Sequence, residues 1–224
     1  QSLKTNKPVR HFIRAFSAVG CVVLYIYGIK YLLLAENMAI AHIAPIVAAL
    51  LAIPILGEKI GMYRVIAIFI GFVGVLIIVK PGSSVFNLGS LFPLGSALFM
   101  ASVYISTRSL MTTESSVSIV FYYSSALLFT SIIFFPNNFI MPDTFNLICA
   151  MSLGIMGSSG HFFMSKAAKF ADVAVTSPFE YTSFIFVGVM AYLFYNEIPN
   201  FSIVIGGLLI IIASIYIAYR ERKN

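Results

Sequence analysis

Charged residues are scarce in this chain. Lys, Arg, Asp and Glu make up 10% of its 224 residues, while 60% of the residues are hydrophobic. A typical soluble domain has about 25% charged residues, so the composition excludes a soluble protein and predicts an all-α protein integral to a membrane. The net charge is +6, but the basic residues lie in short clusters between apolar runs. That distribution is typical of topology signals and not of a nucleic-acid-binding face, so we expect no nucleic-acid partner.

Cysteine is rare as well. Cys21 and Cys149 both lie inside apolar runs, and we interpret them as small hydrophobic residues rather than as a disulfide or a metal-binding pair. The sequence has no nucleotide-binding loop, no cluster of metal ligands and no haem motif. We therefore expect no cofactor, no metal and no ATP-driven transport by this chain alone.

Eight apolar runs are each near the roughly 20 residues that a helix needs to cross about 30 Å of hydrocarbon. The connections between them are short and rich in turn-forming and charged residues, so none of them can hold a soluble domain. The expected membrane-spanning helices cover residues 13–29, 37–56, 64–79, 88–107, 117–135, 145–165, 173–195 and 201–219.

An even number of spans places both ends of the chain on one side of the membrane. Twelve basic residues fall on that side, and only Lys30 and Lys80 fall on the other. Because basic residues accumulate in cytoplasmic loops, we expect both ends to be cytoplasmic and the protein to be a multi-pass component of the bacterial inner membrane.

Sequence similarity recurs at an offset of 139 residues. Gly57-Glu58 matches Asn196-Glu197, and Ala35 matches Ala174. Five expected spans lie between the two glutamates, and this odd number inverts the second copy relative to the first. Inverted repeats are typical of secondary transporters, which bind their substrate near the middle of the bilayer. We therefore predict a bundle built from inverted five-helix repeats.

The predicted repeats divide the chain unevenly. Residues 1–80 contain three spans of the first repeat, residues 88–219 contain all five spans of the second, and residues 220–224 form a cytoplasmic tail. We expect two further spans to precede Gln1, so that eight of ten transmembrane helices are present.

One carboxylate, Glu180, lies about two helical turns inside the apolar span 173–195. An ionisable group at such a depth costs roughly 2.5–3.5 kcal/mol to insert, so it normally faces protein or a water-filled cavity. Pro178 lacks a backbone donor and loosens the helix nearby. Thr176, Glu180 and Ser183 form a polar stripe at helical spacing, and we expect this stripe to line a working centre.

His161 lies on the preceding span, at a depth similar to that of Glu180 when both are counted from the turn between them. We hypothesise that the two side chains interact and sense protons or substrate, because burial favours the neutral form of a carboxyl group and suits one that binds and releases a proton. The alternative is structural. Glu180 would then cap the backbone near Pro178, and His161 would hydrogen-bond a neighbouring helix.

The first repeat supplies candidates for the opposite wall of a cavity. Asn37 and His42 lie on the symmetry-related helix, and His42 occupies the position of Tyr181. Ordinary packing explains each of them at least as well. Tyrosines that could stack on a substrate, or else sit in interfacial belts, are Tyr25, Tyr27, Tyr104, Tyr122, Tyr123 and Tyr181.

Two sequence stretches resemble a known family. Leu34-Ala35-Glu36 leading to Leu56-Gly57-Glu58, and Pro178-Phe179-Glu180-Tyr181-Thr182 leading to Asn196-Glu197-Ile198-Pro199, resemble the two repeats of EamA-type proteins, the ten-helix branch of the drug/metabolite transporter superfamily. The resemblance covers essentially the whole chain, but Asn196 stands where the family usually has glycine. It implies export or uptake of a small metabolite such as an amino acid, a nucleotide sugar or S-adenosylmethionine.

One motif suggests an enzyme instead. Gly157-Ser158-Ser159-Gly160 resembles the GxSG motif of intramembrane serine proteases, and Ala41-His42 resembles their histidine motif. In that family the histidine follows the serine, whereas here it precedes it, and an inverted repeat has no place in a protease. We therefore expect no enzyme.

The function that we expect is secondary transport of a small organic metabolite by alternating access, coupled to protons or to exchange. The partners would be this substrate and the lipid bilayer. The competing prediction is a non-transporting membrane protein on the same fold, such as a receptor or assembly factor. That protein would have a uniformly apolar interior, against which the polar stripe argues.

Overall fold

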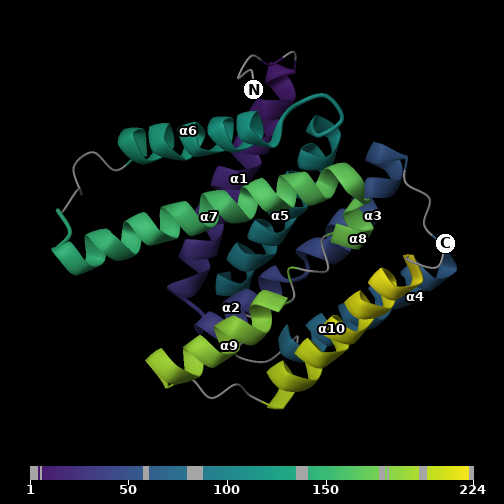
Figure 1. Cartoon of the computed structure of the whole chain (residues 1–224). Helices are drawn as coiled ribbons and strands as arrows, with labels where there is room; N and C mark the ends of the chain where they lie inside the picture. Colours follow the sequence, from purple (N-terminus) through teal and green to yellow (C-terminus); the bar gives the residue numbers. More distant parts are fainter. Residues whose placement is uncertain are drawn as a thin grey trace.

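The computed structural model describes residues 5, 7–57, 61–79, 88–134, 141–176, 180, 182–196 and 201–221. In this part of the chain all regular structure is helical (Figure 1). The helices are α1 (Pro8–Ile29), α2 (Leu34–Ala41), α3 (Ala44–Leu56), α4 (Met62–Val79), the short 3₁₀ turn η1 (Leu88–Ser90), α5 (Leu91–Leu110), α6 (Ser116–Phe134), α7 (Thr144–Phe170), α8 (Val173–Thr176), α9 (Thr182–Tyr195) and α10 (Phe201–Glu221).

Several of these helices suit a membrane. Among the described residues, five stretches are long and apolar enough to cross one, namely Pro8–Ile29, Glu36–Leu56, Leu88–Leu110, Ser116–Ile133 and Thr144–Phe170. Two shorter apolar stretches, Val65–Gly74 and Phe201–Ala213, lie in α4 and α10. These segments coincide with expected spans, and the all-α membrane bundle predicted from the sequence is confirmed.

The expected span 37–56 is not one continuous helix. α2 ends at Ala41 and α3 begins at Ala44, with Pro45 in its first turn. Proline has no N–H to donate, and its ring clashes with the carbonyl of the residue four positions earlier, which here is Ala41. Pro45 therefore explains why the helix is interrupted within this predicted span.

The expected span 173–195 is interrupted too. α8 ends at Thr176, α9 begins at Thr182, and Glu180 lies between them in a 3₁₀ conformation. The offset of 139 residues maps Ile43, which directly precedes α3, onto Thr182, the first residue of α9. The starts of α3 and α9 thus lie close to equivalent positions of the proposed repeat.

A second pair of equivalent positions ends the two broken spans. Gly57 caps α3 with a φ of 71°, and Asn196, which follows α9, has a φ of 53°. Glycine adopts this left-handed conformation freely, and asparagine tolerates it better than most other residues. The substitution of asparagine for the usual glycine at position 196 therefore keeps the same helix ending.

Two long antiparallel pairs, α1 with α5 and α4 with α10, lie side by side in Figure 1. Small residues let helices approach closely in a membrane. α3 packs on α5 through such residues, and a Cβ atom on Gly74 of α4 would lie 2.7 Å from the backbone oxygen of Gly206 of α10. The alanines of the α3–α5 contact are Ala44, Ala48, Ala52, Ala97 and Ala101.

One end of the bundle is rich in basic residues. At this end α1 begins and α3, α5 and α7 end. We call it the basic face and define it by Arg10, Gly57, Arg108 and Lys169. These residues surround a hollow of about 590 Å³. Within it, the guanidinium of Arg108 donates to the carbonyl of Ala168 at 2.6 Å and forms an ion pair with Asp172 at 2.9 Å.

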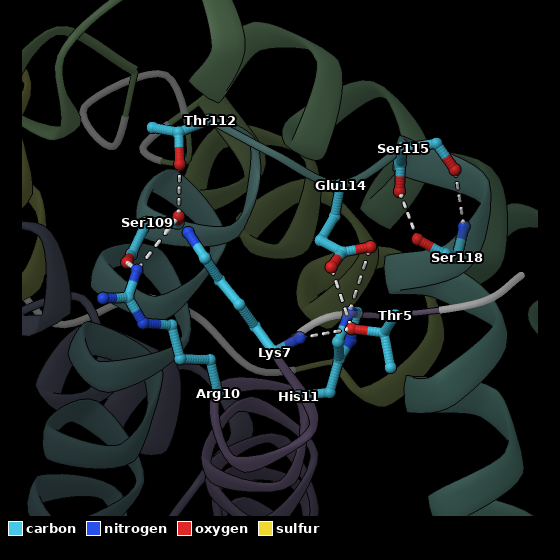
Figure 2. A network of polar contacts seen from close by, with 9 residues as sticks. All are labelled: Thr5, Lys7, Arg10, His11, Ser109, Thr112, Glu114, Ser115 and Ser118. Atoms are coloured by element: carbon cyan, nitrogen blue, oxygen red, sulfur yellow. Dashed lines mark hydrogen bonds and ion pairs between the residues drawn. The ribbon is translucent and has the colours of Figure 1, made fainter. Parts of the chain in front are cut away.

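A polar network joins the start of α1 to the turn between α5 and α6 (Figure 2). Glu114 accepts a hydrogen bond of 2.8 Å from the hydroxyl of Thr5 and lies 3.9 Å from Nε2 of His11. Arg10 donates to the side chain of Ser109. These contacts fix α1 against α5 and α6 at the basic face, and α1 and α5 both form walls of the cavity described next.

Candidate substrate cavity

A cavity of about 270 Å³ lies between the two helix breaks. Its wall contains residues of α1, α2, α3, α5, α6, α7 and α9, so segments from both predicted repeats enclose it. Most of the wall is apolar, and a few polar groups converge on it, as in typical small-molecule sites. The lining residues are Ala18, Cys21, Val22, Tyr25, Met38, Ala41, His42, Ala44, Ser96, Ala97, Met100, Val103, Tyr123, His161, Glu180 and Ser183.

Glu180 lies in the break between α8 and α9, and its side chain lines the cavity. The hydroxyl of Tyr104, on α5, donates a hydrogen bond to its Oε2. Tyr104 is itself buried, in a cluster with Ala44 and Ala97, so packing fixes the donor. The carboxyl group thus has a defined partner on one oxygen and the cavity beside it.

His42 lies in the other break and is buried. Its Nδ1 is 2.7 Å from the backbone oxygen of Met38, which can only accept, so the hydrogen is on Nδ1. Its Nε2, the acceptor in this tautomer, is 3.2 Å from the hydroxyl of Ser183. The same hydroxyl also contacts the backbone oxygen of Glu180, so its one proton serves either acceptor. The two breaks are therefore linked through Ser183, a contact between the predicted repeats.

His161 also lines the cavity, from α7. Its ring lies against Tyr123, with 4.3 Å between the ring centroids, and its buried Nδ1 has no hydrogen-bond partner among the described residues. The predicted pair of His161 and Glu180 thus shares one cavity, but their contacts are with different tyrosines, Tyr123 and Tyr104.

Two other predicted residues, Asn37 and Thr176, are not among the residues that line the cavity. Asn37 is fully buried and donates to the carbonyl of Tyr25 at 3.1 Å, from behind the wall. Thr176 donates to the carbonyl of Asp172 at 3.2 Å within its own helix. Tyr181 lies outside the described residues.

Arg14 is a residue that the sequence reasoning missed. It was counted as a topology signal, yet it is 1% exposed and its Nε donates to the hydroxyl of Thr107 at 2.8 Å. Its guanidinium carbon lies 5.4 Å from the centroid of the Tyr123 ring. The available signal was its place inside an apolar span, the same signal that drew attention to Glu180.

The wall also contains a polar pair that nothing in the sequence indicated. The hydroxyl of Ser96 donates to the carbonyl of Cys21 at 2.9 Å, and its oxygen is 3.3 Å from the Cys21 sulfur. Both cysteines are free thiols. No three His, Cys, Asp or Glu side chains come together as a metal site within the residues that the structure describes.

The protease-like motif has no special geometry. Ser159 donates to the carbonyl of Ile155 at 2.8 Å within α7. A Cβ atom on Gly157 or Gly160 would meet nothing within 4 Å. The motif is therefore an exposed stretch of ordinary helix, while His42 is bound to Ser183 at the cavity.

A helical membrane bundle with a cavity between two broken helices, on which a few polar groups converge, is typical of membrane transporters. Residues 3–80 and 87–219 match the model of the EamA-like transporter family. The chain belongs to this family, which confirms the resemblance found in the sequence, and it is a multi-pass membrane protein.

Individual relatives are consistent with this assignment. The chain is 29% identical over 223 residues to the S-adenosylmethionine uptake transporter of Rickettsia prowazekii (strain Madrid E), covering 100% of this chain and 76% of the relative. It is 26% identical over 226 residues to the riboflavin transporter of Vibrio cholerae serotype O1, again covering 100% and 76%. Both relatives are named as transporters of small metabolites, and with the family they support a small-metabolite transporter rather than an enzyme.

A solved crystal structure shows the same fold. It has a TM-score of 0.72 and 18% sequence identity, and the match covers 99% of this chain and 79% of the other. At this identity the likeness establishes the arrangement of the helices alone.

Proposed function

We propose that this chain is a secondary transporter that moves S-adenosylmethionine, or a similar amino-acid derivative, across the membrane by alternating access. The observation on which the proposal depends is the cavity between the two helix breaks, whose wall includes the polar side chains of Glu180, His42 and His161. The name of the Rickettsia prowazekii relative supports the substrate.

The broken helices suit alternating access. Discontinuous helices at equivalent positions of two repeats place a binding site where one repeat moves against the other. We infer that residues 1–80 and 88–219 are such repeats. The contact of His42 with Ser183 joins the two breaks, so a relative movement of the repeats would change it.

Glu180 is the acidic group of the proposed site. A carboxylate next to a cavity attracts a cation, and S-adenosylmethionine has two positive groups, an ammonium and a sulfonium. The same carboxyl group could instead bind a coupling proton. In both cases its charge is needed, and a neutral amide of the same shape would not replace it.

Counterflow in proteoliposomes tests the proposal. We expect vesicles that contain the full chain and are preloaded with unlabelled S-adenosylmethionine to accumulate the labelled compound. Glu180→Gln should reduce the rate at least about tenfold, since a charge-assisted interaction contributes about 1.5–3 kcal/mol. Glu36→Gln is a matched control, because Glu36 only caps α2, by accepting from the backbone N–H of Leu33 at 3.3 Å.

The outcomes are distinct. Counterflow that is absent with S-adenosylmethionine but present with another metabolite would refute the substrate and leave the transporter intact. A Glu180→Gln rate equal to that of the wild type would refute the role of this carboxylate. If uptake by the variant persists but no longer responds to a pH gradient, Glu180 binds the coupling proton rather than the substrate.

We also propose that the basic face is cytoplasmic and that the membrane is the bacterial inner membrane. The distribution of basic residues supports this orientation, since Arg10, Arg108 and Lys169 all lie at this end of the bundle.

A further inference from the structure

We propose that Arg14 and His161, which both contact the Tyr123 ring, form a subsite that binds the carboxylate of the substrate. The inference rests on the proposed transport function and adds the chemical class of the substrate, namely molecules with a free carboxylate together with a positive group.

Arg14 is a buried cation with no ionic partner in the part of the chain that the structure describes. Its side chain is 1% exposed, and both terminal nitrogens, Nη1 and Nη2, have no hydrogen-bond partner among the described residues. Only Nε is satisfied, by the hydroxyl of Thr107. A charge in this position is strongly destabilising unless something pairs with it. Its unsatisfied donors therefore indicate an anionic ligand that binds there.

Snorkelling does not account for Arg14. Long basic side chains near the end of a membrane helix usually extend toward water, as does Arg10 one turn earlier, which is exposed and contacts Ser109. Arg14 instead packs between α1 and α5 and lies over the ring of Tyr123 on α6.

A second unsatisfied nitrogen belongs to another side chain that contacts the same ring. Tyr123 contacts the guanidinium of Arg14 at 5.4 Å and the ring of His161 at 4.3 Å, measured to its centroid. Nδ1 of His161 is buried and also has no partner in the described part of the chain. A carboxylate has about four acceptor positions, enough for a forked pair from Arg14 and one bond from His161.

Arg14, Tyr123 and His161 lie at or next to the cavity wall. Ala18, one turn after Arg14, and Val103, one turn before Thr107, line the cavity and pack with Tyr123 in one cluster. Tyr123 and His161 are themselves lining residues. Arg14 is not itself a lining residue, but it lies over the ring of Tyr123, which is one. We infer that a change in the Tyr123 rotamer exposes the guanidinium to a bound ligand.

Glu180 and Arg14 both contact side chains of α5. The partner of Glu180 is Tyr104, and the partner of Arg14 is Thr107, three residues further along α5. Three residues correspond to a rise of about 4.5 Å. The acidic and basic groups thus contact side chains three residues apart on one helix, and we assign the ammonium of an amino-acid moiety to Glu180 and its carboxylate to Arg14.

The experiment compares two ligands that differ only in the carboxylate. S-adenosylmethionine and decarboxylated S-adenosylmethionine compete for uptake by proteoliposomes that contain the full chain, and the ratio of their inhibition constants is measured. The wild type should prefer the carboxylate form by roughly tenfold to hundredfold, the range for a charge-assisted pair. Arg14→Met should abolish this preference and leave the inhibition constant of the decarboxylated compound unchanged.

Three further variants complete the test. Arg14→Lys keeps the charge and should retain part of the preference, while Arg10→Met, the same change one turn away at an exposed position, should retain all of it. His161→Phe keeps the ring against Tyr123 but removes the nitrogen, and it should reduce the preference by a smaller factor. If Arg14→Met does not accumulate in the membrane, His161→Phe and Arg14→Lys provide the same readout.

Equal inhibition by the two compounds in the wild type would overturn the subsite and leave the proposed transport function standing. An Arg14→Met variant that keeps the wild-type preference, or that weakens both ligands by the same factor, would also overturn it. If the wild type takes up neither compound, the proposed function fails, and the subsite that rests on it fails as well.

Discussion

Single side chains decide how the carboxyl group of Glu180 is held. Tyr104 donates to one of its oxygens from a buried position, so Tyr104→Phe would remove the donor and leave a polar atom without a partner. Such a loss costs about 1–3 kcal/mol, and we expect a lower unfolding temperature in detergent. Tyr27→Phe is the matched control, because Tyr27 is exposed and its ring stacks on Phe92 whether or not it has a hydroxyl. Equal unfolding temperatures for the two variants would contradict the role given to Tyr104.

The sequence identified Glu180 as a candidate site residue but not Arg14, and the difference has a physical reason. Glu180 stood out because a lone carboxylate inside an apolar span has few explanations. Arg14 did not, because a basic residue near the start of a span also serves as a topology signal. Burial distinguishes the two roles, and the burial of Arg14 depends on Thr107 and Tyr123, which lie far away in the sequence. Periodicity within one helix contains no such information.

At the scale of helices, apolar run length predicted the spans but not their interruptions. The run over 37–56 is long enough to cross a membrane, and hydropathy does not register a local break. Pro45 was the available signal, since a proline one turn after Ala41 cannot continue the preceding helix. In the other repeat Pro178 was noted, and only a loosened helix was expected there. The position of the cavity depends on both breaks, so the residues that line it could not be predicted from the sequence.

Close contact between α4 and α10 leads to a prediction at the same scale. A Cβ atom on Gly74 would lie 2.7 Å from the backbone oxygen of Gly206 and 3.0 Å from the side chain of Ile210. Because backbone cannot move aside easily, Gly74→Ala should push the helices apart and destabilise the protein by about 1–3 kcal/mol. Gly157→Ala adds the same methyl group where nothing lies within 4 Å and should not destabilise it. Thermal unfolding in detergent measures both variants, and equal stability of the two would show that α4 and α10 are not closely packed.

For the whole molecule, two groups of contacts separate the cavity from the basic face. The first is the cluster of Ala18, Val103 and Tyr123, whose members line the cavity. Beyond this cluster, Arg108 joins the end of α5 to the end of α7. We infer that these two layers keep the cavity closed on the basic side, and that an opening toward this side separates α5 from α7.

Labelling of a native cysteine tests this inference and the proposed orientation together. Cys21 lines the cavity, and Cys149→Ser leaves it as the only thiol. In this background Arg108→Met should increase the rate at which a membrane-impermeant maleimide labels Cys21 in inverted vesicles. The increase should be roughly twofold to tenfold, since each lost hydrogen bond shifts the equilibrium by about 0.5–1.5 kcal/mol.

Arg220→Met, a change at the exposed end of α10, should have no effect, and S-adenosylmethionine should slow labelling in both variants. Faster labelling only in right-side-out vesicles would contradict a cytoplasmic basic face, and an unchanged rate in both kinds of vesicle would contradict a closing role for Arg108.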